Sequence, residues 1–289
     1  MSVSPVQITT PGGKAIIVGA DQPLLLIAGP CALESYELAR RVAGTMQEIC
    51  GRLGISYVFK ASFDKANRTS LESYRGPGLE EGLSILSRIR TEMQVPVISD
   101  IHDVSQVAPA AEVLDILQIP AFLCRQTDLL VAAAQSGKPV NLKKGQFVSP
   151  WDMENGVNKL RGAGGQKIML VERGASFGYN NLVVDMRSLP VMRSFDCPVI
   201  FDATHSVQLP GGSGGSSGGQ REFIAPLSRA AVAAGIDGLF MEVHPDPDKA
   251  LCDGPNSMPL DAIEQLLVQL IRIQEAVSAR HHQKATCYG

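Results

Sequence analysis

Short apolar runs alternate with longer segments of helical periodicity along most of this chain. The apolar runs are rich in Val, Ile and Leu, and such continuous runs are typical of parallel strands covered on both faces. They predict strands at residues 24–28, 57–61, 96–100, 116–120, 139–142, 167–171, 198–202 and 238–243. The segments between them predict helices at residues 35–53, 79–93, 127–136, 150–161, 220–234 and 260–278.

Eight strands that alternate with helices predict an α/β fold, the (β/α)8 TIM barrel. Residues 179–195 fit this pattern least, because they carry little helical periodicity. Pro11-Gly-Gly separates two short β-like runs, which predicts an N-terminal β-hairpin at residues 6–19 that covers the N-terminal end of the barrel. We expect one barrel domain over residues 1–289, with a hairpin extension at 1–22 and a tail at 281–289.

Composition argues against several classes of protein. The net charge of −3 argues against a nucleic-acid or membrane-surface role, which usually requires a basic patch. No apolar segment approaches the roughly 20 residues of a membrane-spanning helix, and no signal peptide is recognisable. The six cysteines lack CxxC spacing, which favours free thiols.

Residues 210–219 consist of one proline followed only by glycine and serine. This composition alone favours a flexible, solvated linker. The segment follows the seventh predicted strand, however, on the side of a barrel where active sites lie. That position favours a loop that closes over a site.

Polar residues follow the predicted strands, and in a barrel the carboxyl ends of all strands face one shared site. Among them are five cations, and like charges repel one another unless anions separate them. Phosphates and carboxylates are the expected guests, and the cluster exceeds what one monophosphate requires. The five cations are Lys60, Lys65, Arg68, Lys143 and Arg173.

A second group at the strand ends contains Cys31, His205, Glu242 and Asp253. One thiolate, one imidazole and two carboxylates suit a divalent transition metal. The residues are far apart in sequence, and a buried free cysteine beside a hydrogen-bonded core histidine is the alternative.

Five motifs carry a resemblance to a known family. They are Phe59-Lys-Ala-Ser-Phe-Asp-Lys-Ala-Asn-Arg-Thr-Ser70, Tyr74-Arg-Gly-Pro-Gly78, Ile119-Pro-Ala-Phe-Leu-Cys-Arg-Gln-Thr-Asp128, Arg173-Gly-Ala-Ser-Phe-Gly-Tyr-Asn180 and Cys252-Asp-Gly-Pro255. The chain resembles the 3-deoxy-D-manno-octulosonate 8-phosphate synthases from about residue 24 to the last helix. The resemblance implies a cytoplasmic, homotetrameric barrel enzyme of lipopolysaccharide biosynthesis. Its substrates would be phosphoenolpyruvate, D-arabinose 5-phosphate and water.

The resemblance also implies residue roles. Matches to the phosphoenolpyruvate pocket are Lys60, Lys65, Gln118, Ala121, Lys143 and Arg173. Matches to the sugar phosphate site are Asn67, Arg68 and Ser70, with Arg68 reaching in from a neighbouring subunit, and Ser62 joins the substrate-binding set. The expected catalytic residues are Lys65, Asp100, Lys143, His205 and Asp253, and Asp100 and Asp253 match residues near the reacting carbons and sugar hydroxyls.

Cys31 separates the two branches of this family. Metal-free members carry Asn at this position, whereas metal-dependent members carry Cys. The resemblance therefore implies one divalent ion per subunit, Zn, Fe, Mn or Co, bound by Cys31, His205, Glu242 and Asp253.

Three other interpretations stay open at this point. A 3-deoxy-heptulosonate 7-phosphate synthase would use erythrose 4-phosphate, but that family shows a Lys-Pro-Arg-Thr type motif where this chain has Lys65-Ala-Asn-Arg-Thr69. A Schiff-base aldolase would use a strand-end lysine. A non-catalytic phosphosugar-binding protein would use the same cationic pocket. No role is assigned to Cys50, Cys124, Cys197, Cys252 or the tail.

Overall fold

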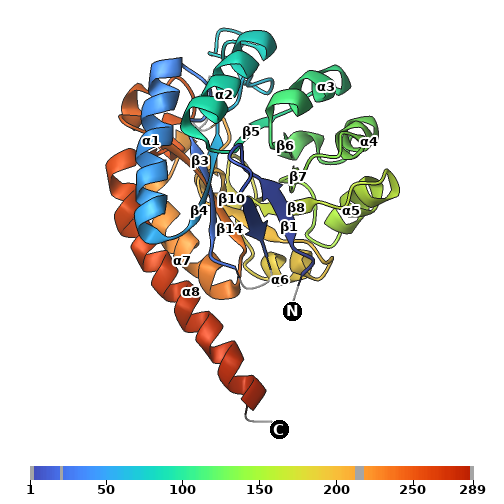
Figure 1. Cartoon of the computed structure of the whole chain (residues 1–289), viewed down its shortest axis with the longest axis vertical. Coiled ribbons are helices and arrows are strands. Elements are labelled where there is room, and N and C mark those ends of the chain that lie inside the picture. The colour runs from blue at the N-terminus through green and yellow to red at the C-terminus, as the bar shows by residue number, and fades with distance from the viewer. Residues whose placement is uncertain (1–2, 20–21, 212–217, 287–289) are drawn as a thin grey trace.

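A closed barrel of parallel strands forms the centre of the computed structural model, which describes residues 3–19, 22–211 and 218–286 (Figure 1). Within these residues the barrel has eight strands: β3 (Leu25–Gly29), β4 (Ser56–Lys60), β5 (Val97–Asp100), β6 (Ile116–Ile119), β7 (Val140–Lys143), β8 (Ile168–Glu172), β11 (Val199–Asp202) and β14 (Gly238–His244). The barrel closes because β14 pairs in parallel with both β3 and β11. The predicted TIM barrel is confirmed.

Helices surround this barrel in chain order (Figure 1). They are α1 (Tyr36–Leu53), α2 (Leu79–Met93), α3 (Val104–Val113), α4 (Thr127–Gln135), α5 (Met153–Gly162), α6 (Ser188–Arg193), α7 (Ile224–Ala234) and α8 (Ile263–Thr286). Helix α1 shows why such segments are helical. Ser35 caps its N-terminus by accepting a hydrogen bond from the Leu38 amide, and Gly54 ends it in the left-handed conformation.

Three helices differ from the sequence expectation. Helix α3 was not predicted, because Pro109 lies inside it and its alanines and valines give weak amphipathicity. Helix α6 falls within residues 179–195 and has only six residues, too few for a periodic signal. Helix α8 continues to Thr286, beyond the predicted end at residue 278, so residues 281–286 of the expected tail are helical. The last three residues of that tail lie outside the described part of the chain.

Strands β1 (Val6–Thr9) and β2 (Ala15–Val18) form the predicted antiparallel hairpin. In Figure 1 the hairpin crosses the middle of the barrel. Its buried side chains belong to one apolar cluster with inward-facing barrel residues such as Ile98, Ile116 and Ile200. The hairpin therefore closes the end of the barrel opposite the strand carboxyl ends.

Five short strands lie in the loops that follow the carboxyl ends of the barrel strands, among the described residues. They are β9 (Ala175–Ser176) paired with β10 (Leu182–Val183), β12 (Gln208–Leu209) paired with β13 (Gly218–Gly219), and β15 (Met258–Pro259). The β12–β13 pair joins the two ends of the glycine-rich segment. Residues 212–217 between them lie outside the described part of the chain. The prediction of a loop that closes over the site concerns these residues and is therefore not tested.

We predict that Ile8→Ala destabilises the fold by roughly 2–5 kcal/mol, because the variant leaves a cavity in a closely packed core. Ile8 is 1% exposed, whereas Gln7 on the other face of β1 is exposed. Chemical denaturation would measure the loss, with Gln7→Ala as the control that stays within about 0.5 kcal/mol of wild type. Equal stability of the two variants would show that the hairpin does not contribute to the core.

Candidate active site

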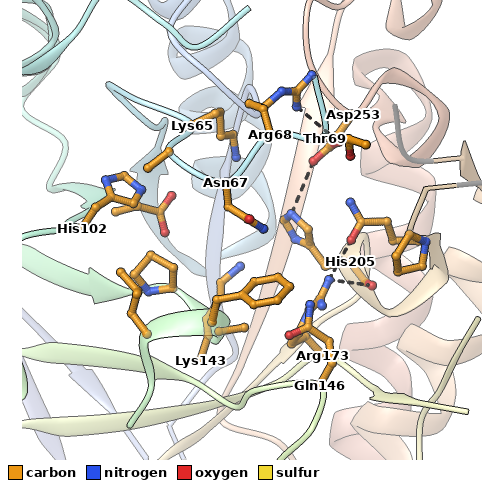
Figure 2. Close-up of a pocket in the computed structure, with 18 of the residues that line it drawn as sticks. Lys65, Asn67, Arg68, Thr69, His102, Lys143, Gln146, Arg173, His205 and Asp253 are labelled. Atoms are coloured by element: carbon orange, nitrogen blue, oxygen red, sulfur yellow. Dashed lines mark hydrogen bonds and ion pairs between the residues drawn. The ribbon is translucent and has the colours of Figure 1, made fainter. Parts of the chain in front are cut away.

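A cavity of about 590 Å³ opens at the carboxyl ends of the barrel strands (Figure 2). Ten of the predicted site residues line it: Lys60, Lys65, Asn67, Arg68, Asp100, Ala121, Lys143, Arg173, His205 and Asp253. Lys60, Asp100 and Lys143 are the last residues of β4, β5 and β7. Because parallel strands end at the same rim, residues far apart in sequence meet there.

Asp100 is held by a row of amide and hydroxyl groups. Its Oδ2 accepts a hydrogen bond from Ser62 Oγ at 2.5 Å, and its Oδ1 accepts one from Gln118 Nε2 at 2.7 Å. Asn141 Nδ2 in turn donates to Gln118 Oε1 at 2.9 Å. Burial raises the pKa of Asp100, but Lys60 and the neighbouring lysines outweigh it and hold the pKa below its ordinary value. Ser62 and Gln118 thus orient a charged carboxylate and do not line the cavity themselves.

Glu242, on β14, forms ion pairs with two lysines. Its Oε1 is 2.9 Å from Lys60 Nζ and 3.5 Å from Lys65 Nζ. Burial raises the pKa of Glu242, yet Lys60 and Lys65 hold it well below its usual range. Its Oε2 is buried without a hydrogen-bond partner among the described residues. That oxygen is free to bind a ligand.

Asp202 connects the cationic residues to His205. Its Oδ2 accepts hydrogen bonds from Lys143 Nζ at 2.5 Å and from His205 Nδ1 at 2.8 Å. This contact places the ring proton on Nδ1 and leaves His205 Nε2 facing Glu242 and Asp253 at 3.6 and 3.8 Å. Sequence analysis placed Asp202 outside the site residues, although its position at a strand end, three residues before His205, is the signal that identifies it.

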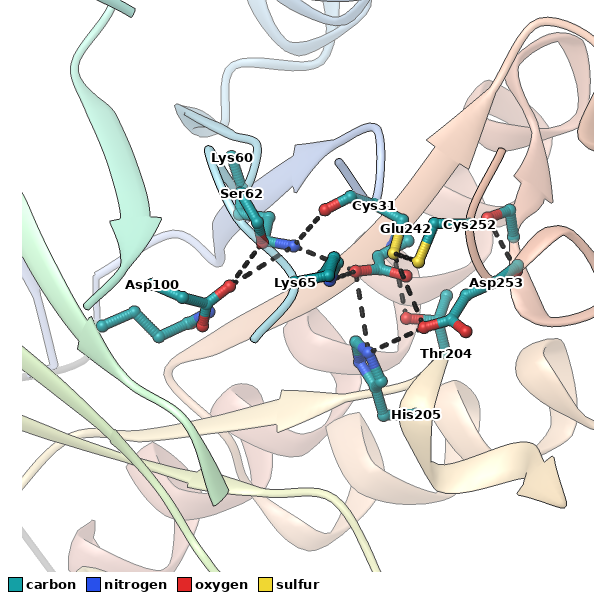
Figure 3. Close-up of polar contacts among 12 residues, drawn as sticks. Cys31, Lys60, Ser62, Lys65, Asp100, Thr204, His205, Glu242, Cys252 and Asp253 are labelled. Carbon is teal, nitrogen blue, oxygen red and sulfur yellow. Dashed lines mark hydrogen bonds and ion pairs between the residues drawn. The ribbon is translucent and has the colours of Figure 1, made fainter. Parts of the chain in front are cut away.

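The four predicted metal-binding residues lie close together, and two of them, His205 and Asp253, line the cavity (Figure 3). Donor atoms of His205, Glu242 and Asp253 lie within 4.8 Å of one another, and so do those of Cys31, Cys252 and Asp253. Cys31 Sγ is 3.5 Å from Asp253 Oδ2 and 2.9 Å from Cys252 Sγ. Burial and the Cys252 thiol raise the pKa of Cys31 well above its ordinary value. Sequence reasoning left Cys252 without a role, because only the fold brings it beside Cys31.

Arg68 and Ser70 lie differently from the other predicted residues. Arg68 Nη1 donates to Cys252 Sγ at 2.8 Å and is 4.0 Å from Asp253 Oδ1, so the side chain points into the cavity of its own chain. Ser70 does not line the cavity, and its Oγ accepts a hydrogen bond from the Glu72 amide. Thr69 lines the cavity instead.

Three polar residues that sequence reasoning did not assign to the site also line the cavity: His102, Gln146 and Gln208. Burial lowers the pKa of His102, so its ring is neutral at neutral pH. Gln208 Oε1 accepts a hydrogen bond from Arg173 Nη2 at 3.0 Å. The first two follow predicted strands closely, which is the signal that could have identified them.

The cavity therefore combines buried cations with a cluster of residue types that bind metal ions. Arg173 is 3% exposed, and its Nη1 has no hydrogen-bond partner among the described residues. Lys143 Nζ lies 3.7 Å from the centre of the Phe240 ring, an attractive contact that leaves the charge available to a ligand. A buried donor and a lysine of this kind suit a small molecule that carries phosphate and carboxylate groups.

Fold and site together define a TIM-barrel enzyme that acts on a small anionic substrate. Residues 4–279 match the DAHP synthetase I family, and the chain belongs to this family. The 2-dehydro-3-deoxyphosphooctonate aldolase of Desulfotalea psychrophila is 76% identical over 275 residues, which are 95% of this chain and 98% of that protein. The protein of the same name from Geobacter metallireducens is 65% identical over 260 residues, 90% of this chain and 96% of that one. The Syntrophotalea carbinolica aldolase is 63% identical over 262 residues, 91% and 95% of the two chains.

None of the helices in the described part of the chain combines the length and the apolarity that a membrane crossing requires.

We predict that Asp202→Asn destabilises the protein by roughly 3–5 kcal/mol, because Lys143 loses its buried counter-charge. Denaturant titration of both proteins would measure the difference. Asp185→Asn is the matched control, since Asp185 forms an exposed ion pair with Arg187 and should change stability by less than about 1 kcal/mol. A fully stable Asp202→Asn variant would mean that Lys143 does not depend on this carboxylate.

Proposed function

We propose that this enzyme condenses phosphoenolpyruvate with D-arabinose 5-phosphate and water, giving 3-deoxy-D-manno-octulosonate 8-phosphate and phosphate. The observation that carries the proposal is the group of cations at the strand ends, which exceeds what one phosphate needs. Phosphoenolpyruvate brings a phosphate and a carboxylate to the same three-carbon unit. The curated relatives carry the alternative name of this enzyme, which favours it over a heptulosonate synthase, a Schiff-base aldolase or a non-catalytic binding protein.

Phosphoenolpyruvate would lie between Lys60, Lys65, Lys143 and Arg173, with Ala121 at the cavity wall and Gln118 behind it, where it orients Asp100. Arg173 Nη1 supports this placement, because it is a buried donor that has no protein partner among the described residues. Fixed donors of this kind stabilise charge that develops during a reaction without having to reorganise.

In the reaction, the enol carbon attacks the sugar aldehyde and a C–C bond forms. Water adds to the second carbon of the phosphoenolpyruvate unit, and the resulting hemiketal phosphate loses phosphate by C–O cleavage. Lys65 and Lys143 would stabilise the anionic groups while that carbon takes on positive character. Asp100 and Asp253 would hold the sugar hydroxyls and the reacting water, and His205 would lie beside them.

The sugar phosphate would bind near the outer rim, where Asn67 and Arg68 line the cavity. Ser70 does not line the cavity, so Thr69 would take the place predicted for it at that end of the site. Because Arg68 points into the cavity of its own chain, it would bind the sugar phosphate of its own subunit, and the enzyme would assemble as a homotetramer. We further propose that the chain is a single barrel domain and that the enzyme works in the cytoplasm, in lipopolysaccharide biosynthesis.

One divalent ion, Zn, Fe, Mn or Co, would be held by Cys31, His205, Glu242 and Asp253. The residues fit such an ion, because soft and hard donors converge and Glu242 Oε2 is a buried acceptor with no hydrogen-bond partner in the described part of the chain. The bound ion would polarise the aldehyde or orient the water. Cys31 would lose its thiol proton on binding, since the thiolate is the metal ligand.

Substrate choice provides the direct test of the proposed function. Phosphate release from phosphoenolpyruvate should be efficient with arabinose 5-phosphate and at least about tenfold less efficient with erythrose 4-phosphate, which corresponds to about 1.4 kcal/mol. The physical reason is the Lys65-Ala-Asn-Arg segment at the sugar end of the cavity. Equal kcat/KM for the two sugars would refute this substrate assignment.

Metal content is a separate prediction. Elemental analysis of the purified enzyme should find one divalent ion per subunit, and Cys31→Ala should lose most of it because the softest ligand is gone. Cys124→Ala is the matched control, since Cys124 is also buried but lies outside the cluster. Exhaustive chelation should abolish activity. Full activity after chelation, together with normal turnover of Cys31→Ala, would place this enzyme in the metal-free branch.

A further inference from the structure

Lys144 is a buried charged residue that the proposed reaction does not use. It follows Lys143 at the end of β7 and is 2% exposed. Successive residues of a strand point to opposite faces, so Lys143 enters the cavity and Lys144 lies behind it. Lys144 is absent from the cavity lining. We expect a buried lysine to have polar partners, because burying an isolated ammonium group is unfavourable in free energy.

Its ammonium group binds carbonyl oxygens from two loops. In the loop after β7, Lys144 Nζ is 3.4 Å from Gly145 O and 3.5 Å from Val148 O. In the turn after β8, it is 3.1 Å from Gly174 O. Glu172 Oε1, at 3.4 Å, supplies the counter-charge. One side chain thus connects the loops that follow two neighbouring strands.

The Lys144–Glu172 pair fixes the backbone beside Arg173. Glu172 Oε1 accepts a hydrogen bond from the Gly174 amide at 2.6 Å, while Lys144 binds the Gly174 carbonyl. Gly174 has φ of +88°, a conformation that glycine adopts without strain. Because the amide and the carbonyl of Gly174 are both hydrogen-bonded, the backbone conformation directly after Arg173 is fixed.

The same pair also acts on Gln146. This residue lies between the two carbonyls that Lys144 binds in the loop after β7, and it lines the cavity. Its Oε1 is buried without a hydrogen-bond partner among the described residues. The Gln146 carbonyl accepts a hydrogen bond from the Ser176 amide at 2.8 Å, which joins the two loops a second time. Gln146 and Arg173 both line the cavity (Figure 2).

We propose that Lys144 is a positioning residue that holds Arg173 and Gln146 in the geometry for binding an anion. The proposal rests on the proposed function in one respect, that phosphoenolpyruvate is the anion bound there. Lys144 itself touches no substrate. Its effect should therefore appear in the affinity for phosphoenolpyruvate and should be separable from its effect on stability.

The test compares three variants of the full-length enzyme: Lys144→Met, Lys144→Met with Glu172→Gln, and Lys159→Met. Lys159→Met is the matched control, because Lys159 also donates to a backbone carbonyl, that of Arg125 at 3.0 Å, but lies outside this cavity. Isothermal calorimetry would give the Kd for phosphoenolpyruvate, and thermal unfolding would give Tm. Both measurements are independent of turnover.

Lys144→Met should raise the Kd at least tenfold and lower Tm, because Glu172 is left buried and unpaired. Adding Glu172→Gln should restore part of the lost Tm, since the unpaired charge is removed. The Kd should stay raised, because the loop carbonyls still lack their donor. Lys159→Met should leave the Kd unchanged.

An unchanged Kd in Lys144→Met would overturn the inference, and so would a Kd that recovers together with Tm in the double variant. If the single variant does not fold, the neutral double variant still gives the Kd that decides the question. A wild-type enzyme that binds phosphoenolpyruvate but makes no eight-carbon sugar phosphate would defeat the proposed function alone. The Kd comparison would then still test the role of Lys144.

Discussion

Pairing between buried cations and buried carboxylates is the constraint on which the site depends. Lys60 forms an ion pair with Glu242, and Lys143 forms one with Asp202. In each pair the nitrogen and oxygen atoms are less than 3 Å apart, and both side chains are buried. Without these carboxylates the ammonium groups would repel one another and lose their charge to burial. Burial does lower the pKa of Lys143, and Asp202 opposes that shift. The carboxylates keep the cations charged and in place before any substrate arrives.

The barrel makes this pairing possible through the alternation of side chains along each strand. Inward residues near the strand starts are apolar and pack against the hairpin, whereas inward residues at the strand ends are charged. Phe240 lies between these layers, with its ring facing Lys143. The charged site thus lies directly against an apolar core. The low dielectric constant of that core strengthens the electrostatic interactions of the site. The outward residues at the strand ends, such as Lys144, connect the site to the loops around it.

The parts of the fold that follow from the local pattern of apolar and polar residues were predictable from the sequence. Every barrel strand appeared as a short apolar run, and α3 and α6 were missed because a proline or a short length obscures their periodicity. The cations were predictable because each follows a strand. Asp202 carries the same strand-end signal, but its pairing with Lys143, 59 positions away, could not be predicted. Cys252 was not assigned, because only the fold brings it to Cys31, 221 positions away. Sequence can indicate which residues reach the rim, but only the packed barrel shows which of them pair.

Paired cations at the strand ends form the binding site that we propose for phosphoenolpyruvate. The most direct measurement is the calorimetric Kd for phosphoenolpyruvate of Lys143→Ala and of Lys167→Ala, whose lysine is exposed just before β8 at the other end of the barrel. The account predicts that Lys143→Ala weakens binding by roughly 2–5 kcal/mol, because a desolvated anion loses its partner, and that Lys167→Ala changes nothing. An unchanged Kd in a folded Lys143→Ala variant would contradict the account.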